Sequence, residues 1–256
     1  MLTTSIAVTE APLVAFCLRH ADDTLVLGHR LSEWSGKAPM LEEDLALSNI
    51  ALDLIGQARA LYQYAGGLCG RSEDELAYLR DERDYRNLLL VEQPNGDFAG
   101  TIMRQFLFTA FVGPFWHALT GSTDATLAAI AAKAEKESAY HLRHAGEWLV
   151  RLGDGTDESH RRVQAALDWL WPFTGELFTR DAVEDAMIAA AIASDPESLR
   201  PAWSHSVEKI LARATLRRPA DGWMHSGGRV GRHSEHLGFL LAELQFLARS
   251  HPGASW

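Results

Sequence analysis

The sequence predicts an all-α protein in which a four-helix bundle is followed by additional helices. Apolar residues recur at helical spacing over most of the chain, as Leu127, Ile130 and Ala134 do. The alternating pattern of β-strands joined by hairpin turns is not evident anywhere in the sequence. Four of the predicted helices are long, and one longer connection separates the second from the third.

The first two helices are predicted at about 12–33 and 39–65. The first ends at the Ser-Gly pair 35–36. Pro39 suits the first turn of the second helix, because its missing N–H would be unpaired there in any case. The Gly-Gly pair 66–67 is expected to end that helix.

The connection between the second and third helices contains a short helix and an irregular segment. Ser72 and Glu75 form a capping box for the short helix. Residues 80–96 are predicted to be a connector that breaks at Pro94-Asn95-Gly96, and its charged start, RDERDYR, to be a solvated surface.

The third and fourth long helices complete the predicted bundle. The third runs from about Asp97 to Ala118, and Pro114 is expected to kink it because proline removes a backbone donor. The fourth is capped by Ser122 and ends at Gly153.

The rest of the chain is predicted to be helical with one glycine-rich interruption. Helices are expected near 157–178, 181–193 and 197–216, followed by a glycine-rich loop and a final helix to about Arg249. We therefore predict a single ferritin-like domain over residues 1–256, with a core bundle at about 10–153 and additional helices at about 157–250.

Composition and charge exclude several classes of function. The net charge of −10 argues against a nucleic-acid surface. No apolar run approaches the roughly 20 residues that span a bilayer. The N-terminal segment lacks the features of a signal peptide, so we expect a cytoplasmic protein. Cys17 and Cys69 are expected at different levels of the first two helices and to stay reduced.

The fourth helix carries a polar pair on its apolar stripe that points to metal chemistry. Glu137 and His141 are similar to the Glu-x-x-His ligand pairs of ferritin-like di-iron bundles, although their spacing is four rather than three. Asp23 in the first helix and Asp53 in the second could face the same interior. These four residues are the candidate positions of a degenerate metal site.

The remaining positions do not complete a di-iron centre, which needs about four carboxylates and two histidines. The third helix has no Asp or Glu between Phe98 and Ala118, and its central polar groups are Arg104 and Gln105. We therefore predict no metal ligand, cofactor-binding residue or catalytic residue in this chain. Asp53, Glu137 and His141, with Arg104 or Gln105, are expected to form a buried hydrogen-bonded network. A mononuclear metal site remains an alternative.

The glycine-rich loop at 227–233 has two interpretations. Its glycines free backbone donors just before a helix, as in loops that bind anions, and Arg229 and Arg232 could contact a phosphate. The loop lacks the Lys-Ser/Thr ending of a nucleotide-binding P-loop. An ordered connector or an interface loop is the other interpretation.

Four segments resemble one known family over nearly the whole chain. They are DDTLVLGHRLSEWSGKAPMLEEDLALSNIALDLIGQARALYQYA at 22–65, RDERDYRNLLLVEQPNGDFA at 80–99, KESAYHLRHAGEWLVRLGDGT at 136–156 and GGRVGRHSEHLGFLLAELQFL at 227–247. By these segments the chain is similar to the structural C subunits of the multicomponent phenylacetyl-CoA epoxidases (ring 1,2-phenylacetyl-CoA monooxygenases) of aerobic phenylacetate catabolism.

The resemblance implies a non-catalytic structural subunit with a ferritin-like fold. Its implied partners are a homologous catalytic oxygenase subunit, which carries the di-iron centre and binds phenylacetyl-CoA, a small accessory subunit and a flavin/iron-sulfur reductase. Two other hypotheses remain. One is a metal-dependent oxygenase acting through Asp23, Asp53, Glu137 and His141. The other is a regulatory module that reads CoA phosphates through the arginines of the glycine-rich loop.

Overall fold

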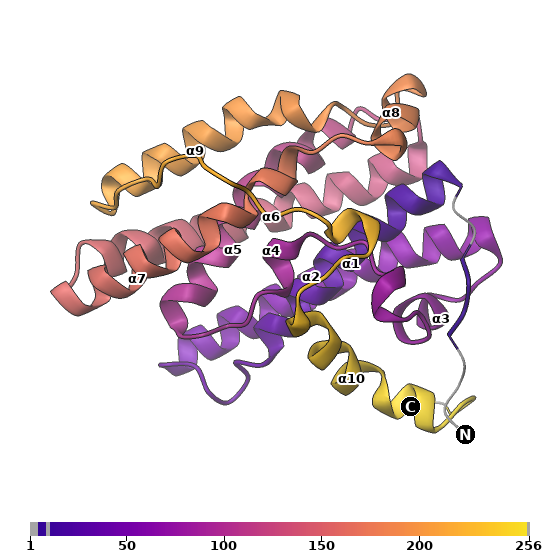
Figure 1. Cartoon of the computed structure of the whole chain (residues 1–256), viewed down its shortest axis with the longest axis horizontal. Helices are drawn as coiled ribbons and strands as arrows, with labels where there is room; N and C mark the ends of the chain where they lie inside the picture. The colour runs from indigo at the N-terminus through magenta and orange to yellow at the C-terminus, as the bar shows by residue number, and fades with distance from the viewer. Residues whose placement is uncertain (1–4, 9–10, 255–256) are drawn as a thin grey trace.

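The described residues form α-helices joined by turns and short 3-10 segments. The computed structural model describes residues 5–8 and 11–254, and within these ranges it contains ten α-helices and no strand. This confirms the predicted all-α class and agrees with a ferritin-like bundle followed by further helices (Figure 1). Residues 1–4, 9–10 and 255–256, which the predicted domain limits include, lie outside the described part of the chain.

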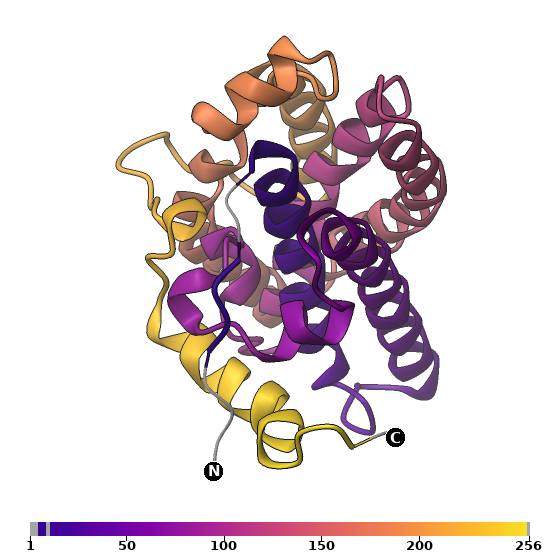
Figure 2. The same cartoon turned by 90° about the vertical axis from the view of Figure 1, so that its right-hand side faces the viewer.

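Two helical hairpins make the core bundle. The first pairs α1 (Pro12–Ser32) with α2 (Leu41–Cys69), and the second pairs α5 (Phe98–Leu119) with α6 (Ala125–Gly153). Figure 2 shows α1 near the centre, surrounded by the other helices. Every residue is buried from Phe16 to Gly28 in α1 and from Ala99 to Val112 in α5. Polar residues on these stretches therefore require partners inside the protein.

Helix α2 continues past the glycine pair that was expected to end it. It ends at Cys69, and Gly70 supplies the left-handed cap with φ of 70°. Gly66 instead permits a close approach, because a Cβ there would lie 2.3 Å from the carbonyl oxygen of Arg71. The predicted end at Ala65 is therefore wrong by one turn.

Aspartate caps set the N-terminal starts of α5 and α6. Asp97 accepts a hydrogen bond from the amide of Gly100 and starts α5, which then runs without interruption through Pro114. Asp124, rather than the predicted Ser122, caps α6 by accepting from the amides of Thr126 and Leu127.

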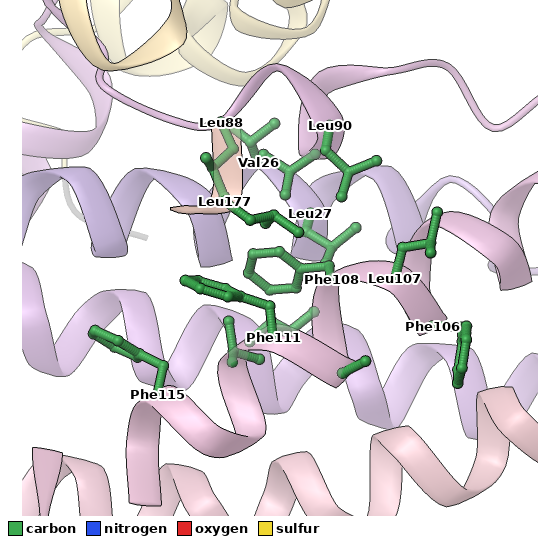
Figure 3. Close-up of a cluster of buried hydrophobic side chains, with 14 of the residues drawn as sticks. Val26, Leu27, Leu88, Leu90, Phe106, Leu107, Phe108, Phe111, Phe115 and Leu177 are labelled. Carbon is green, nitrogen blue, oxygen red and sulfur yellow. The ribbon is translucent and has the colours of Figure 1, made fainter. Parts of the chain in front are cut away.

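The connection between the hairpins is more ordered than the sequence indicates. Helix α3 (Glu73–Tyr78) begins with the predicted capping box. A 3-10 turn, η1 (Glu82–Asp84), and the short helix α4 (Leu89–Glu92) follow it. Figure 3 shows that Leu88 and Leu90 of this segment point into the core beside Val26 and Leu27 of α1.

The additional helices cover the bundle on several sides. The segment predicted at 157–178 is a helix only to Leu170, because Pro172 falls in the next turn and cannot continue it. The helices are α7 (Asp157–Leu170), α8 (Ala182–Ala189), α9 (Arg200–Arg213) and α10 (Glu235–Ser250), with 3-10 turns η2 (Trp171–Phe173), η3 (Gly175–Phe178), η4 (Pro196–Leu199) and η5 (Gly228–Val230) between them. Helices α7 and α9 pack on the second hairpin, α8 packs on α1, and α10 packs on α3 (Figure 1).

The aromatic residues of α5 fill the core. Phe106, Phe108, Phe111 and Phe115 are buried, and Figure 3 places Phe108 and Phe111 near Leu177 of η3. The rings of Phe111 and Phe178 meet edge to face, with centroids 5.6 Å apart. This packing joins the additional segments to the bundle.

Two further observations concern cysteines and membranes. Cys17 and Cys69 are both free thiols, as predicted. Among the described residues, no helix combines the length and the apolar character that crossing a lipid bilayer requires.

Candidate functional site

Helices α2 and α6 contact each other through polar side-chain pairs, which we call the α2–α6 seam. His141 Nε2 lies 3.0 Å from Asp53 Oδ2, and Gln57 Nε2 donates to Glu137 Oε2 at 2.9 Å. Residues four apart share one face of a helix, so each helix presents two of these groups to the other. The seam comprises Glu43, Asp53, Gln57, Glu137, His141 and His144.

The seam consists of separate side-chain pairs at the edge of the bundle. The His141 side chain is buried, but that of Asp53 is 38% exposed. Burial lowers the pKa of His141, and the hydrogen bond with Asp53 opposes that shift without reversing it. At neutral pH, His141 is therefore a neutral imidazole whose Nε2–H donates to the carboxylate. This confirms the predicted contact between Asp53 and His141.

The polar groups of α5 do not join the seam. The guanidinium of Arg104 donates to the backbone oxygen of Gln93 and to Asn95 Oδ1. Gln105 Nε2 donates to Thr109 Oγ1 at 3.0 Å. The prediction that Arg104 or Gln105 completes the network is wrong, because both side chains find partners near their own helix.

Asp23 is likewise separate from the other three candidate positions. Its two carboxylate oxygens accept from Arg229 at 3.1 and 2.8 Å, and the amide of Leu88 donates to it at 2.7 Å. Burial raises the pKa of Asp23 to about 6, against the opposing effects of Arg229 and this amide. The carboxylate is thus ionised at neutral pH. The predicted convergence of Asp23 with Asp53, Glu137 and His141 is wrong.

The side chains present do not fit a di-iron centre. Such a centre brings about four carboxylates and two histidines together between four helices. In the described part of the chain, no three His, Cys, Asp or Glu side chains are arranged to hold a metal ion. The two carboxylates of α1, Asp22 and Asp23, are buried and are instead bound by arginines.

The glycine-rich loop binds carboxylates of the protein itself. The amides of Gly227 and Gly228 donate to Glu176 Oε1 at 2.9 and 2.8 Å. The guanidinium of Arg229 is only 13% exposed and binds Asp23. Loop amides can therefore bind an anion here, as the sequence indicates, but the anion is internal. Arg229 is not available to an external phosphate, whereas Arg232 is exposed.

A buried ion pair that the sequence does not reveal joins the start of the connector to α1. Arg80 and Asp22 are 1% and 0% exposed, and Arg80 Nη1 lies 3.1 Å from Asp22 Oδ2. The hydroxyl of Tyr62 and the amide of Arg86 also donate to Asp22. The predicted solvated surface at 80–86 is confirmed for residues 81–84, which are exposed, and is wrong for Arg80 and Tyr85, which are buried. The adjacent acids Asp22 and Asp23 in the middle of the first helix were the sequence signal of buried cations.

The glycine-rich loop makes a second set of buried contacts just before α10. His233 Nδ1 lies 2.9 Å from Glu92 Oε2, and the side chains of both residues are fully buried. The amide of Ser234 donates to the other oxygen of Glu92 at 2.6 Å. Burial alone would lower the pKa of His233, but Glu92 and the carbonyl of Tyr85 outweigh burial and raise it.

The contact between His233 and Glu92 predicts that His233 stabilises the protein most at low pH. Its pKa in the folded state lies above its ordinary value of 6.5, so the folded protein holds the proton more tightly. The stabilisation is fully present below that value and is lost as the pH rises through the folded-state pKa. Urea unfolding of the wild type and of His233→Gln between about pH 5.5 and about pH 9 should show a free-energy difference that shrinks with rising pH. A constant difference would contradict the assignment.

The fold and these internal contacts define a ferritin-like helical protein whose first helix carries buried, arginine-bound carboxylates. The chain belongs to the phenylacetic acid catabolic protein family, whose model matches residues 2–256. It is 51% identical over 245 residues to the C subunit of the 1,2-phenylacetyl-CoA epoxidase of Escherichia coli (strain K12). That alignment covers 95% of this chain and 99% of the relative.

Proposed function

We propose that this chain is the non-catalytic structural subunit of a multicomponent phenylacetyl-CoA 1,2-epoxidase in aerobic phenylacetate catabolism. It stabilises a homologous catalytic subunit, which carries the di-iron centre and binds phenylacetyl-CoA. A small accessory subunit and a reductase complete the assembly. The similarity to the corresponding epoxidase component of Escherichia coli supports this assignment.

The observation that carries the non-catalytic role is the binding of the buried carboxylates of α1 by arginines. Asp22 and Asp23 are the acids of α1 that face the interior, and they bind Arg80 and Arg229. A carboxylate held by a guanidinium in this way is not free to bind a cation, because displacing the arginine would leave it buried and unpaired. The helix that should add a further acid, α5, has none.

The proposal predicts that iron and activity reside in the partner. The chain purified alone should contain substoichiometric iron and should not consume oxygen with phenylacetyl-CoA and reductase. Adding the catalytic subunit should produce turnover. Metal analysis, optical spectra and oxygen uptake measure these outcomes. Stoichiometric iron with a di-iron spectrum in the isolated chain would overturn the proposal.

Variants of the α2–α6 seam distinguish a structural role of this chain from a catalytic one. With saturating His141→Gln or Glu137→Gln chain, turnover by the complex should stay within about twofold of the wild type, because neither side chain touches the reacting atoms. Asp97→Asn, at the cap of α5, is a matched structural control. A loss of turnover by orders of magnitude in the seam variants alone, with the complex intact, would favour a metal-dependent oxygenase in this chain.

A further inference from the structure

A small cavity lies where α1 meets α5, η3, η5 and α8. Its apolar wall includes Phe111 and Phe115 of α5 (Figure 3). Its polar lining includes His20 of α1, Glu184 of α8 and Arg229 of η5. The volume open to a water-sized molecule is about 10 Å³. A space of this size holds one water molecule when enough polar groups surround it.

The imidazole of His20 makes no direct hydrogen bond within the described part of the chain. The residue is 6% exposed, and its Nε2 is buried without a partner. Nδ1 lies 3.7 Å from Asp23 Oδ2, which is too far for a hydrogen bond. Burial and two nearby arginines lower the pKa of His20 well below its ordinary value. The ring is therefore neutral at neutral pH, and one of its nitrogens can accept a hydrogen bond.

Glu184 and Arg229 each keep one polar group that no described residue binds. Glu184 Oε1 accepts from Arg19 Nη1 at 2.6 Å, whereas no donor among the described residues reaches Oε2. The Nη1 and Nη2 groups of Arg229 bind Asp23 and backbone oxygens, but its Nε–H has no acceptor there. The cavity is thus lined by residues that offer one free acceptor and one free donor beside the imidazole.

We propose that this cavity binds one ordered water molecule, which joins α1 to α8 and η5. The water accepts a hydrogen bond from Arg229 Nε–H and donates to Glu184 Oε2 and to a ring nitrogen of His20. Three partners are typical of a buried water, and each partner gains the hydrogen bond that its burial requires. The inference is independent of the proposed function, because it concerns contacts within this chain alone.

Charge and size select water over an ion or an organic ligand. The carboxylates of Glu176 and Glu184 would repel an anion, and the guanidinium of Arg229 would repel a cation. The oxygens of Glu176 already accept from the amides of Leu89, Gly227 and Gly228. The remaining groups require a neutral molecule that both donates and accepts, and the volume limits it to water.

A crystal structure of the full-length wild type tests the proposal directly. A solvent peak is expected within about 3.2 Å of a ring nitrogen of His20 and of Glu184 Oε2. This measurement needs no variant, so it does not depend on how a substitution affects folding. The proposal is overturned if the cavity has no peak in a map that shows other buried waters. An anomalous signal from a halide or a metal ion at this position would also overturn it.

Magnetic relaxation dispersion of the water oxygen nucleus counts long-lived internal waters in solution. His20→Phe should remove one water from the wild-type count, because a phenyl ring fills the space and offers no hydrogen bond. The rings of Phe16 and Phe115, with centroids 4.7 and 4.3 Å from that of His20, would pack against it.

His117→Phe is the matched control, because it makes the same substitution on a side chain that is 77% exposed. Its count of internal waters should equal that of the wild type. Circular dichroism and urea unfolding verify that both variants are folded. An unchanged count in folded His20→Phe, or an equal loss in both variants, would contradict a water bound at His20. If His20→Phe does not fold, the wild-type crystal structure decides the question.

Discussion

Replacing Arg80 by methionine is expected to lower the free energy of unfolding by about 4 kcal/mol, because it leaves a buried carboxylate without its counter-charge. Asp22 is fully buried, and Arg80 binds both of its oxygens. Methionine retains much of the side-chain volume, so the loss reports charge rather than a large cavity. Urea unfolding followed by circular dichroism measures the change.

A double variant and a surface control identify the cause. Asp22→Asn/Arg80→Met removes both charges, and it should recover part of the lost stability because no ion remains uncompensated. Arg161→Met breaks an exposed ion pair with Glu158 and should change stability by less than about 1 kcal/mol. If the double variant is less stable than Arg80→Met, the uncompensated charge is not the source of the loss.

The core bundle could be predicted from the sequence because its signals are local. The apolar repeat and the Ser-Gly pair after the first helix place α1 within one residue of its observed end at Ser32. The positions of Asp53 on the second helix and of Glu137 and His141 on the fourth also predict which faces meet. Helix propensity and periodicity act over a few turns, so they can be recognised without the tertiary structure.

The connector at 80–92 could not be predicted in this way, because its structure depends on distant residues. Arg80 is buried by Asp22, which lies 58 positions earlier. Glu92 is buried by His233, which follows it by 141 positions. A run of alternating charges is ordinarily a solvated surface, and nothing in the run itself indicates that its arginine pairs with an acid inside the bundle.

The candidate site could be predicted only in part for the same reason. Asp53 and His141 are predicted on facing helices, and they meet. Asp23 is predicted to face the same interior, but its partner Arg229 comes from a loop 206 positions away. The glycine pattern of that loop indicates anion binding, and its amides and guanidinium do bind carboxylates. The identity of those carboxylates required the structure.

Replacing Gly228 by alanine is expected to lower the free energy of unfolding by about 3 kcal/mol, because an added methyl group cannot be accommodated between two backbones. A Cβ at this position would lie 2.1 Å from the carbonyl oxygen of Asn87. Relief of that clash must move the loop away from the connector. The movement weakens the bonds from Gly227 and Gly228 to Glu176 and the pairing of Arg229 with Asp23.

Gly222→Ala is the matched control, because it makes the same substitution in the same long linker where nothing lies within 4 Å of the added Cβ. Its stability should stay within about 0.5 kcal/mol of the wild type. Urea midpoints of the two variants, measured side by side, isolate the effect of close approach from the effect of a glycine-to-alanine change on the unfolded chain. Equal midpoints would mean that the loop relaxes around the methyl group without disturbing the internal carboxylates. In that case, the close contact with the connector would not be what holds Arg229 against Asp23.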